Sequence, residues 1–220
     1  MRRIISFIKS TILFFAAMFA VLFIYDSLFP PISTLMMART LTVRHVWRDY
    51  VPMRRISPHL VAAAIAAEDG KFCTHHGIDW ESLQDVVKDK LEDGDDSHGA
   101  STITMQTVKN LFLWNSRSVV RKAVEIPLAM ALDLVWSKRH VMQTYLNVAE
   151  FGRGLFGAEA ASQRYFGKHA SALSPREAAL LAATLPNPKK RNPARPSGYM
   201  LGYAGIIQGR MSQVETRCTR

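Results

Sequence analysis

The sequence predicts an all-α, or mainly α, protein, and two observations carry that prediction. Helix start signals followed by apolar runs recur along the chain, as at Ser57-Pro58 and Ser174-Pro175; serine is a preferred N-cap and proline fits the first helical position. Alternation of apolar and polar residues, the pattern of a half-buried strand, never persists beyond a few residues. The chain of 220 residues is long enough to bury a core.

The first element has the pattern of a membrane anchor. Ile4 to Tyr25 is nearly all apolar and carries one charge, Lys9. As a helix this stretch would extend roughly 33 Å, enough to cross a bilayer. Arg2 and Arg3 precede it, so the positive-inside rule places the N-terminus in the cytoplasm. A cleaved signal peptide is the alternative, but no clean small-residue cleavage site follows this long stretch.

The next elements follow from local signals. Residues 40–50 fit either a short strand or an irregular linker. The run from Leu60 to Ala67 is apolar on all sides, which predicts a buried helix that begins at Ser57 and ends near Gly70. An amphipathic helix is expected from Trp80 to Leu91, before a mobile acidic loop over residues 92–99.

Helical patterns continue to residue 185. They cover residues 102–113, 118–136, 138–149 and 157–165, and Pro127 in the second predicts a kink or a new helix start. A Ser174/Glu177 capping box then opens the apolar run Ala178 to Leu185, which ends at Pro186. We therefore expect a cytoplasmic stub and anchor over 1–30, a linker over 31–55, a helical domain over 56–190 and a basic tail over 191–220, near anionic headgroups.

Composition excludes several classes of protein. Hydrophobic residues make up 48% of the chain and only two cysteines are present, which excludes a disordered chain and a disulfide-rich scaffold. The formal charge of +10 indicates an anionic partner: nucleic acid, phospholipid headgroups or a phosphorylated substrate. A domain outside the cytoplasmic membrane rarely meets nucleic acid, so no nucleic-acid partner is expected. Cys73 and Cys218 would then lie in an oxidising compartment; pairing stays open, and a buried free thiol at Cys73 is the favoured interpretation.

Glu68 is the first candidate for chemistry. It ends an apolar helix beside Asp69, where burial and a neighbouring acid would raise its pKa toward the value that a general base needs. The alternative is that the two acids merely decorate a helix end, although acids oppose the dipole there.

Several segments in order carry a family resemblance. They are E-D-G-K-F-C-T-H-H-G-I-D at 68–79, G-A-S-T-I-T-M-Q-T-V-K-N at 99–110, R-K-A-V-E at 121–125, K-R-H-V-M-Q-T-Y-L-N at 138–147, and the glycine-rich and Y-F-G-K segments at 151–157 and 160–168. Together they resemble the motifs of the peptidoglycan glycosyltransferases, glycosyltransferase family 51, and within it the monofunctional biosynthetic transglycosylases. The match covers roughly residues 56–190.

The resemblance implies a fold and an activity. The fold would be lysozyme-like and α-helical, with a smaller membrane-facing lobe. The enzyme would polymerise lipid II, a disaccharide-peptide on polyprenyl pyrophosphate, into β-1,4-linked glycan strands and release the pyrophosphate. The donor carbon inverts in one displacement, and Glu68 would be the catalytic base.

A cluster of cations suits the leaving group. Lys109, Arg117, Arg121 and Lys122 lie within fourteen residues, and such a cluster suits pyrophosphate; a solvated helix face or contact with lipid headgroups is the alternative. Glu125, one turn after Arg121, would hold that arginine. The resemblance also implies a catalytic role for Glu125 and, through the substrate pyrophosphate, a contact with a divalent metal, Mg²⁺ or Mn²⁺. No organic cofactor is expected.

The remaining site residues come from the same segments. Ser101, Thr102, Gln106 and Asn110 offer hydroxyls and amides to sugar and phosphate oxygens, and Gly99 would let the backbone approach the ligand. Asp69, Phe72 and His75 join this substrate-binding set; Phe72 and His75 would shape the loop behind Glu68, with a structural hydrogen bond at His75. Residues 111–114 fit an interfacial patch or a buried core strip equally well.

Two other functions remain as alternatives. A lytic transglycosylase or muramidase shares the lysozyme-like fold but gains nothing from clustered cations. A non-catalytic scaffold of the wall-synthesis machinery belongs to another class. The expected partners are lipid II, the growing glycan strand and membrane lipids, with other wall-synthesis proteins left open. The expected location is the inner membrane, with one span and the catalytic domain on the periplasmic face.

Overall fold

The chain is described by a computed structural model, which describes residues 9–10, 17, 20–21, 24–25, 29–43, 45–92, 101–114, 116 and 118–220. It divides into two units, Met1–Pro31 and Ile32–Arg220. Most of the expected anchor over Ile4–Tyr25 lies outside the described residues. Among the residues that are described, no helix has both the length and the hydropathy to cross a membrane.

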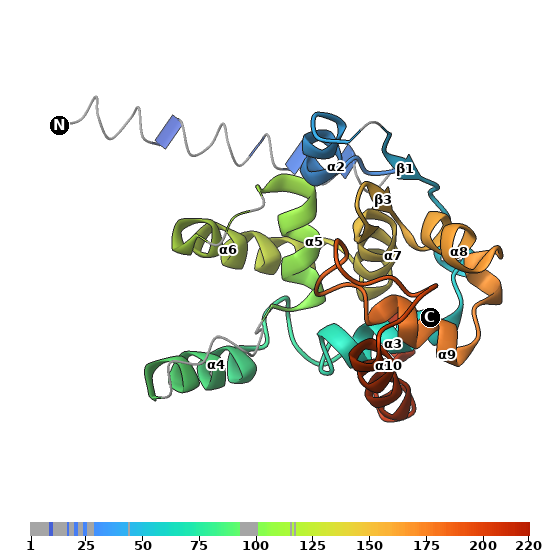
Figure 1. The fold of residues 1–220 in the computed structure, drawn as a ribbon. Coiled ribbons are helices and arrows are strands. Elements are labelled where there is room, and N and C mark those ends of the chain that lie inside the picture. Colours follow the sequence, from blue (N-terminus) through green and yellow to red (C-terminus); the bar gives the residue numbers. More distant parts are fainter. Residues whose placement is uncertain are drawn as a thin grey trace. The chain divides into compact units, whose positions relative to one another are not determined.

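The second unit is mainly helical, as predicted (Figure 1). Its α-helices are α2 (Thr34–Thr40), α3 (Pro58–Glu68), α4 (Trp80–Glu92), α5 (Ile103–Phe112), α6 (Val119–Val135), α7 (Lys138–Val148), α8 (Ala158–Phe166), α9 (Pro175–Ala182) and α10 (Gly198–Arg210). Within the described residues they are accompanied by the 3-10 helices η1 (Met53–Arg55), η2 (Ala170–Ala172) and η3 (Arg217–Thr219). The helix α6 is single and contains Pro127, so a new helix start at that proline is wrong.

A small sheet lies beside these helices. It consists of β1 (Trp47–Arg48), β2 (Glu150–Gly152) and β3 (Leu155–Phe156) in the order β1-β3-β2. The strand β1 runs parallel to β3, and β2 runs antiparallel to it. The strand alternative for residues 40–50 therefore holds for two residues only. Strands this short cannot show an alternating pattern in sequence.

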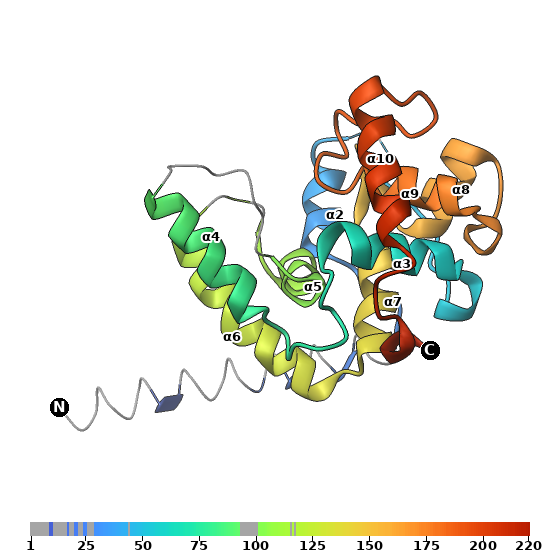
Figure 2. The ribbon, with the colours of Figure 1, turned by 90° about the horizontal axis from the view of Figure 1, so that it is seen from below.

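Two groups of helices flank α5. In both views, α4 and α6 lie on one side of α5, and α3, α9 and α10 lie on the other (Figures 1 and 2). The fully buried side chains of Leu60 and Ile65 lie on α3, which packs against α9 and α10. The prediction of a buried helix is confirmed for five of the eight residues of Leu60–Ala67, while Ala62, Ala66 and Ala67 are half-buried.

The C-terminal region differs from the expected tail. Residues 198–210 form α10, with Ser197 as the N-cap accepting a hydrogen bond from the Met200 amide. Met200, Ala204 and Ile207 are buried at helical spacing, so one face of the helix packs on the core. Four glycines in the helix (Gly198, Gly202, Gly205 and Gly209) lower its intrinsic propensity and obscured it in the sequence.

A disulfide joins Cys73 to Cys218, 145 residues later. The favoured interpretation of Cys73 as a free thiol is therefore wrong. The cause is tertiary: the chain leaving α10 returns to the loop that follows α3, and nothing in the local sequence indicates that return.

Candidate active site

A cleft of about 450 Å³ opens at the end of α3. Glu68 and Asp69 reach it from α3, Ser101 and Thr102 from the start of α5, and its other polar walls are Asp79, Ser82, Arg210 and Gln213. The cleft therefore combines residues from the first and second motifs with residues from the C-terminal region.

Glu68 is half-buried at this cleft, with one carboxylate oxygen fully buried. Its Oε2 accepts a hydrogen bond of 2.7 Å from Gln106 Nε2. Its Oε1 is buried and, within the described residues, has no hydrogen-bond partner. Burial raises the pKa of Glu68, against the lowering effects of the Gln106 bond, Lys109 and Arg191. A carboxylate with a raised pKa and one unbonded oxygen is suited to accept a proton.

Asp69 ties the loop after Glu68 to α5 and to His75. It accepts a hydrogen bond of 2.8 Å from the Ile103 amide, and His75 Nε2 hydrogen-bonds its Oδ1 at 2.9 Å. Thr102 caps α5 and donates to the Gly77 carbonyl at 2.6 Å. These contacts tie the end of α3 to the start of α5, so Asp69, His75 and Thr102 position the site. Phe72 is fully buried and shapes the same loop from the core.

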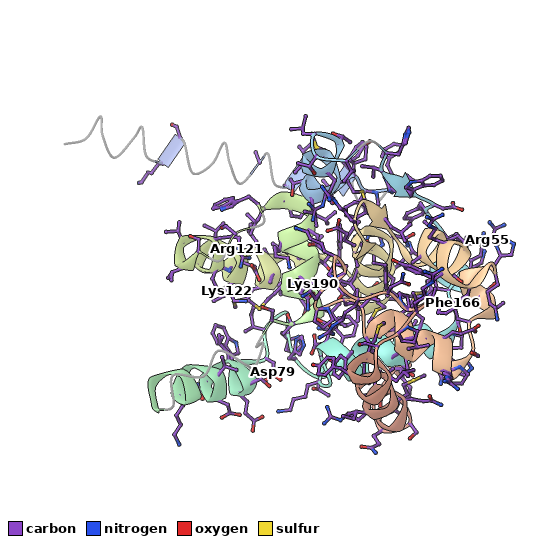
Figure 3. All side chains as sticks on the ribbon, in the orientation of Figure 1. Arg55, Asp79, Arg121, Lys122, Phe166 and Lys190 are labelled. Carbon is purple, nitrogen blue, oxygen red and sulfur yellow. A yellow bond between two sulfur atoms is a disulfide. The ribbon has the colours of Figure 1, made fainter. Side chains whose placement is uncertain are left out.

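Two predicted cations lie together on α6, where Figure 3 shows Arg121 and Lys122 side by side. Arg121 Nη1 donates to Glu125 Oε2. Lys122 Nζ lies 3.2 Å from Glu125 Oε1 and donates to Ser101 Oγ at 2.7 Å. Since Ser101 lines the cleft, Lys122 lies at its edge. Burial, together with Arg121 and Lys109, lowers the pKa of Lys122 to about 8.

Lys109 and Asn110 lie on the adjoining turn of α5. Both line a second cavity of about 190 Å³ that also contains Gln106 and Tyr145. Burial lowers the pKa of Lys109. The Tyr145 hydroxyl donates to Gln106 Oε1 at 3.3 Å, which orients the Gln106 amide with its N–H toward Glu68. Gln106 therefore links the two cavities.

Gly99 and Arg117 lie outside the described residues. In segment 111–114, Leu111 and Leu113 are buried while Trp114 is exposed, so the segment is part core strip and part surface.

The sequence interpretation missed several residues near Glu68. Arg191 lies against the rings of Tyr199 and Tyr203, 5.4 and 5.3 Å from their centroids, and lowers the pKa of Glu68. Arg210 and Gln213 line the cleft itself. All lie in the region assigned to a tail. The one available signal was the Ser197 N-cap before an apolar stretch.

The expected metal contact does not fit the observed environment of Glu125. This carboxylate is 1% exposed, and each oxygen already has a cationic partner, Arg121 or Lys122. Among the described residues, no group of three or more metal-binding side chains could hold an ion. Glu125 is arranged here to hold two cations.

Comparisons with known proteins found a matching family and similar sequences. The transglycosylase family model matches residues 35–212. A protein of Agrobacterium fabrum named biosynthetic peptidoglycan transglycosylase is 52% identical over 180 residues, which cover 82% of this chain and 79% of the relative. A protein of Rhodopseudomonas palustris with the same name is 49% identical over 216 residues, covering 98% of this chain and 95% of the relative.

Proposed function

The chain belongs to the transglycosylase family, and on that premise we propose that Glu68 is the general base of an inverting glycosyl transfer from lipid II. The activity is that of a peptidoglycan glycosyltransferase. The observation that carries the mechanism is the buried Glu68 carboxylate, which has a raised pKa and lies beside cations at the edge of one cleft.

The proposed step is a single displacement. The 4-hydroxyl oxygen of the acceptor sugar attacks the anomeric carbon of the donor from the face opposite the pyrophosphate. Glu68 accepts the hydroxyl proton as the new C–O bond forms. The bond to the pyrophosphate oxygen breaks, and the leaving group takes the electron pair. The α-linked donor thereby becomes a β-1,4-linked product.

The cations stabilise the charge that develops on the leaving group. Lys109, Arg121 and Lys122 are proposed to contact the pyrophosphate. Glu125 is proposed to be a positioning residue, because it holds Arg121 and Lys122 from a buried position. No step runs through a metal. We propose that a divalent cation, where one is required, arrives on the substrate pyrophosphate.

We also propose that the catalytic unit works at the outer face of the inner membrane. The apolar, singly charged stretch Ile4–Tyr25 supports an anchor. The disulfide supports an oxidising compartment. The helix α6 supports contact with lipid, since Val119, Leu134 and Val135 are exposed on it.

The test is polymerisation of purified lipid II by the full-length protein. We expect glycan polymer from the wild type, none above background from Glu68→Gln, and normal polymer from Glu81→Gln, because Glu81 pairs with Lys71 on the surface. Full activity of Glu68→Gln would remove Glu68 as the base.

A second arm separates synthesis from cleavage. Incubation with finished glycan strands should release no soluble fragments. Release of such fragments would indicate a lytic enzyme, and lipid II binding without turnover would indicate a scaffold.

A further inference from the structure

A further cavity lies away from Glu68. It has a volume of about 850 Å³ and shares no lining residue with the catalytic cleft. Its walls come from β1, the β2–β3 hairpin, α8 and the loop that precedes α10. Figure 3 places Phe166, the last residue of α8, on the opposite side of the unit from Arg121 and Lys122. We call this the arginine cavity.

Charge is the main feature of the arginine cavity. Arg48, Arg153, Arg164 and Arg195 line it, against one acid, Asp49. Arg164 and Arg195 are exposed, and within the described part of the chain neither forms an ion pair. Two guanidinium groups without a protein carboxylate are available for a ligand carboxylate, which arginine binds through two parallel hydrogen bonds.

The other walls suit a sugar. Trp47 is 65% exposed at the cavity and offers an aromatic face on which a sugar ring can stack. Gln163 and Asn192 also line the cavity. Gln163 Nε2 already contacts Glu159 and His169, and Asn192 Oδ1 accepts from the Ala194 amide. A sugar hydroxyl would therefore meet Gln163 Oε1 and Asn192 Nδ2. An exposed indole beside arginines and amides therefore favours an anionic saccharide.

The cavity is held open by the fold. The Trp47 amide donates to the Gly154 carbonyl at 2.8 Å, and the Tyr165 hydroxyl donates to the Phe151 carbonyl at 3.1 Å. Any side chain at Gly152 would collide with that hydroxyl, so glycine there permits the close approach. Preformed walls lower the entropic cost of binding.

We propose that the arginine cavity is a second binding site for the glycan strand, separate from the catalytic cleft. The strand offers sugar rings to Trp47 and peptide carboxylates to Arg164 and Arg195. The identity of this ligand rests on the proposed function, whereas the ligand chemistry, an anionic saccharide-peptide, rests on the cavity. An acidic phospholipid headgroup shares the charge but offers no chain of sugar rings.

The experiment measures binding directly, in full-length Glu68→Gln protein in detergent, so that turnover does not interfere. The probe is a tetrasaccharide fragment of the glycan that carries its peptides, titrated by calorimetry. Two sites are expected. The double variant Arg164→Gln/Arg195→Gln should lose one of them, with affinity there reduced roughly tenfold or more. Trp47→Ala should weaken binding of the fragment at the same site.

The matched control is Arg54→Gln/Arg176→Gln, which removes two exposed arginines outside the cavity and should retain both sites. Glycan fragments stripped of peptide should not bind at the arginine-dependent site. A single site in every protein, or equal binding of stripped fragments, would overturn the proposal. So would binding of acidic phospholipid vesicles, but not of glycan, through Arg164 and Arg195.

This result is independent of the catalytic assignment. Should Glu68→Gln still polymerise lipid II, the proposed base is wrong, yet the comparison between the arginine variants still reports on the cavity. Should the arginine variants bind like the parent, the cavity proposal fails while the role of Glu68 stands.

Discussion

Glu68 is subject to opposing influences on its ionisation. Burial raises its pKa, while the hydrogen bond from Gln106 and the charge of Lys109 lower it. The balance leaves a carboxylate whose pKa lies above that of an exposed glutamate, which makes it the stronger base once ionised. Each neighbour can therefore be tested by its effect on the pH profile.

Gln106→Leu should shift the acid limb of kcat/KM to higher pH. The Gln106 bond favours the charged form of Glu68, so its removal raises the pKa further, and the base stays protonated over a wider acidic range. The measurement is a pH–rate profile with lipid II. Gln208→Leu, an exposed change on α10, should leave the limb in place. An acid limb at the same or a lower pH in Gln106→Leu would contradict the assignment of Glu68 as the base.

Lys122 should set the alkaline limit of kcat/KM. Its pKa in the free protein is lowered to about 8, so kcat/KM should fall as the pH rises through that value and the charge is lost. Lys122→Arg should move this limb to higher pH even where the overall rate drops, since a guanidinium stays protonated. The exposed Lys189→Arg change is the control. An alkaline limb that stays near the same pH in Lys122→Arg would exclude Lys122.

At the scale of elements, α6 combines two tasks on one helix. Its Glu125 side is buried and holds the cations, while Val119 and Leu134 are 86% and 88% exposed. We propose that a lipid bilayer covers this exposed apolar face. The cations near the cleft would then lie close to the pyrophosphate of a lipid-anchored substrate.

Leu134→Lys/Val135→Lys should lower polymerisation in vesicles several-fold, because two charges at the proposed lipid contact oppose insertion of the helix. With a short-chain, water-soluble lipid II analogue in detergent the variant should match the wild type. Leu201→Lys, which places a charge at an exposed apolar position on α10, serves as the control in both assays. Equal losses in vesicles and in detergent would indicate damage to the fold rather than to membrane contact.

At the scale of the whole molecule, the Cys73–Cys218 disulfide joins the loop behind Glu68 to the C-terminal segment. That segment follows α10, and Gln213 within it lines the catalytic cleft. The bond therefore fixes one wall of the cleft relative to the base.

Removal of this bond by Cys73→Ser/Cys218→Ser should lower the free energy of unfolding by about 3–5 kcal/mol, because a long loop gains entropy in the unfolded chain. Thermal unfolding of the oxidised wild type and the variant measures the difference. A reductant should lower the Tm of the wild type and leave the variant unchanged. A wild-type Tm that does not respond to full reduction would show that the bond adds no stability.

Most of the helical order could be predicted from sequence, because caps and apolar periodicity are local signals. The Ser57 cap, the Ser174/Glu177 capping box and the apolar run of α3 each predict an element that the structure contains. The strand β1 was one of two alternatives for residues 40–50, while β2, β3 and α10 were missed. Two- or three-residue strands show no period, and the glycines of α10 weaken its helix signal.

The sequence by itself determined the motif residues of the site: Glu68, Gln106, Lys109 and the cations of α6 stand in local patterns whose residue types indicate their chemistry. Only the tertiary structure decided their partners. Asp69, His75 and Thr102 form hydrogen bonds that tie α3 to α5, and both oxygens of Glu125 have cationic partners. Cys73 pairs with Cys218, and Arg191, Arg210 and Gln213 lie near Glu68. The reason is physical: residue type and spacing are written along the chain, whereas burial and contact depend on segments that are distant in sequence and meet only on folding.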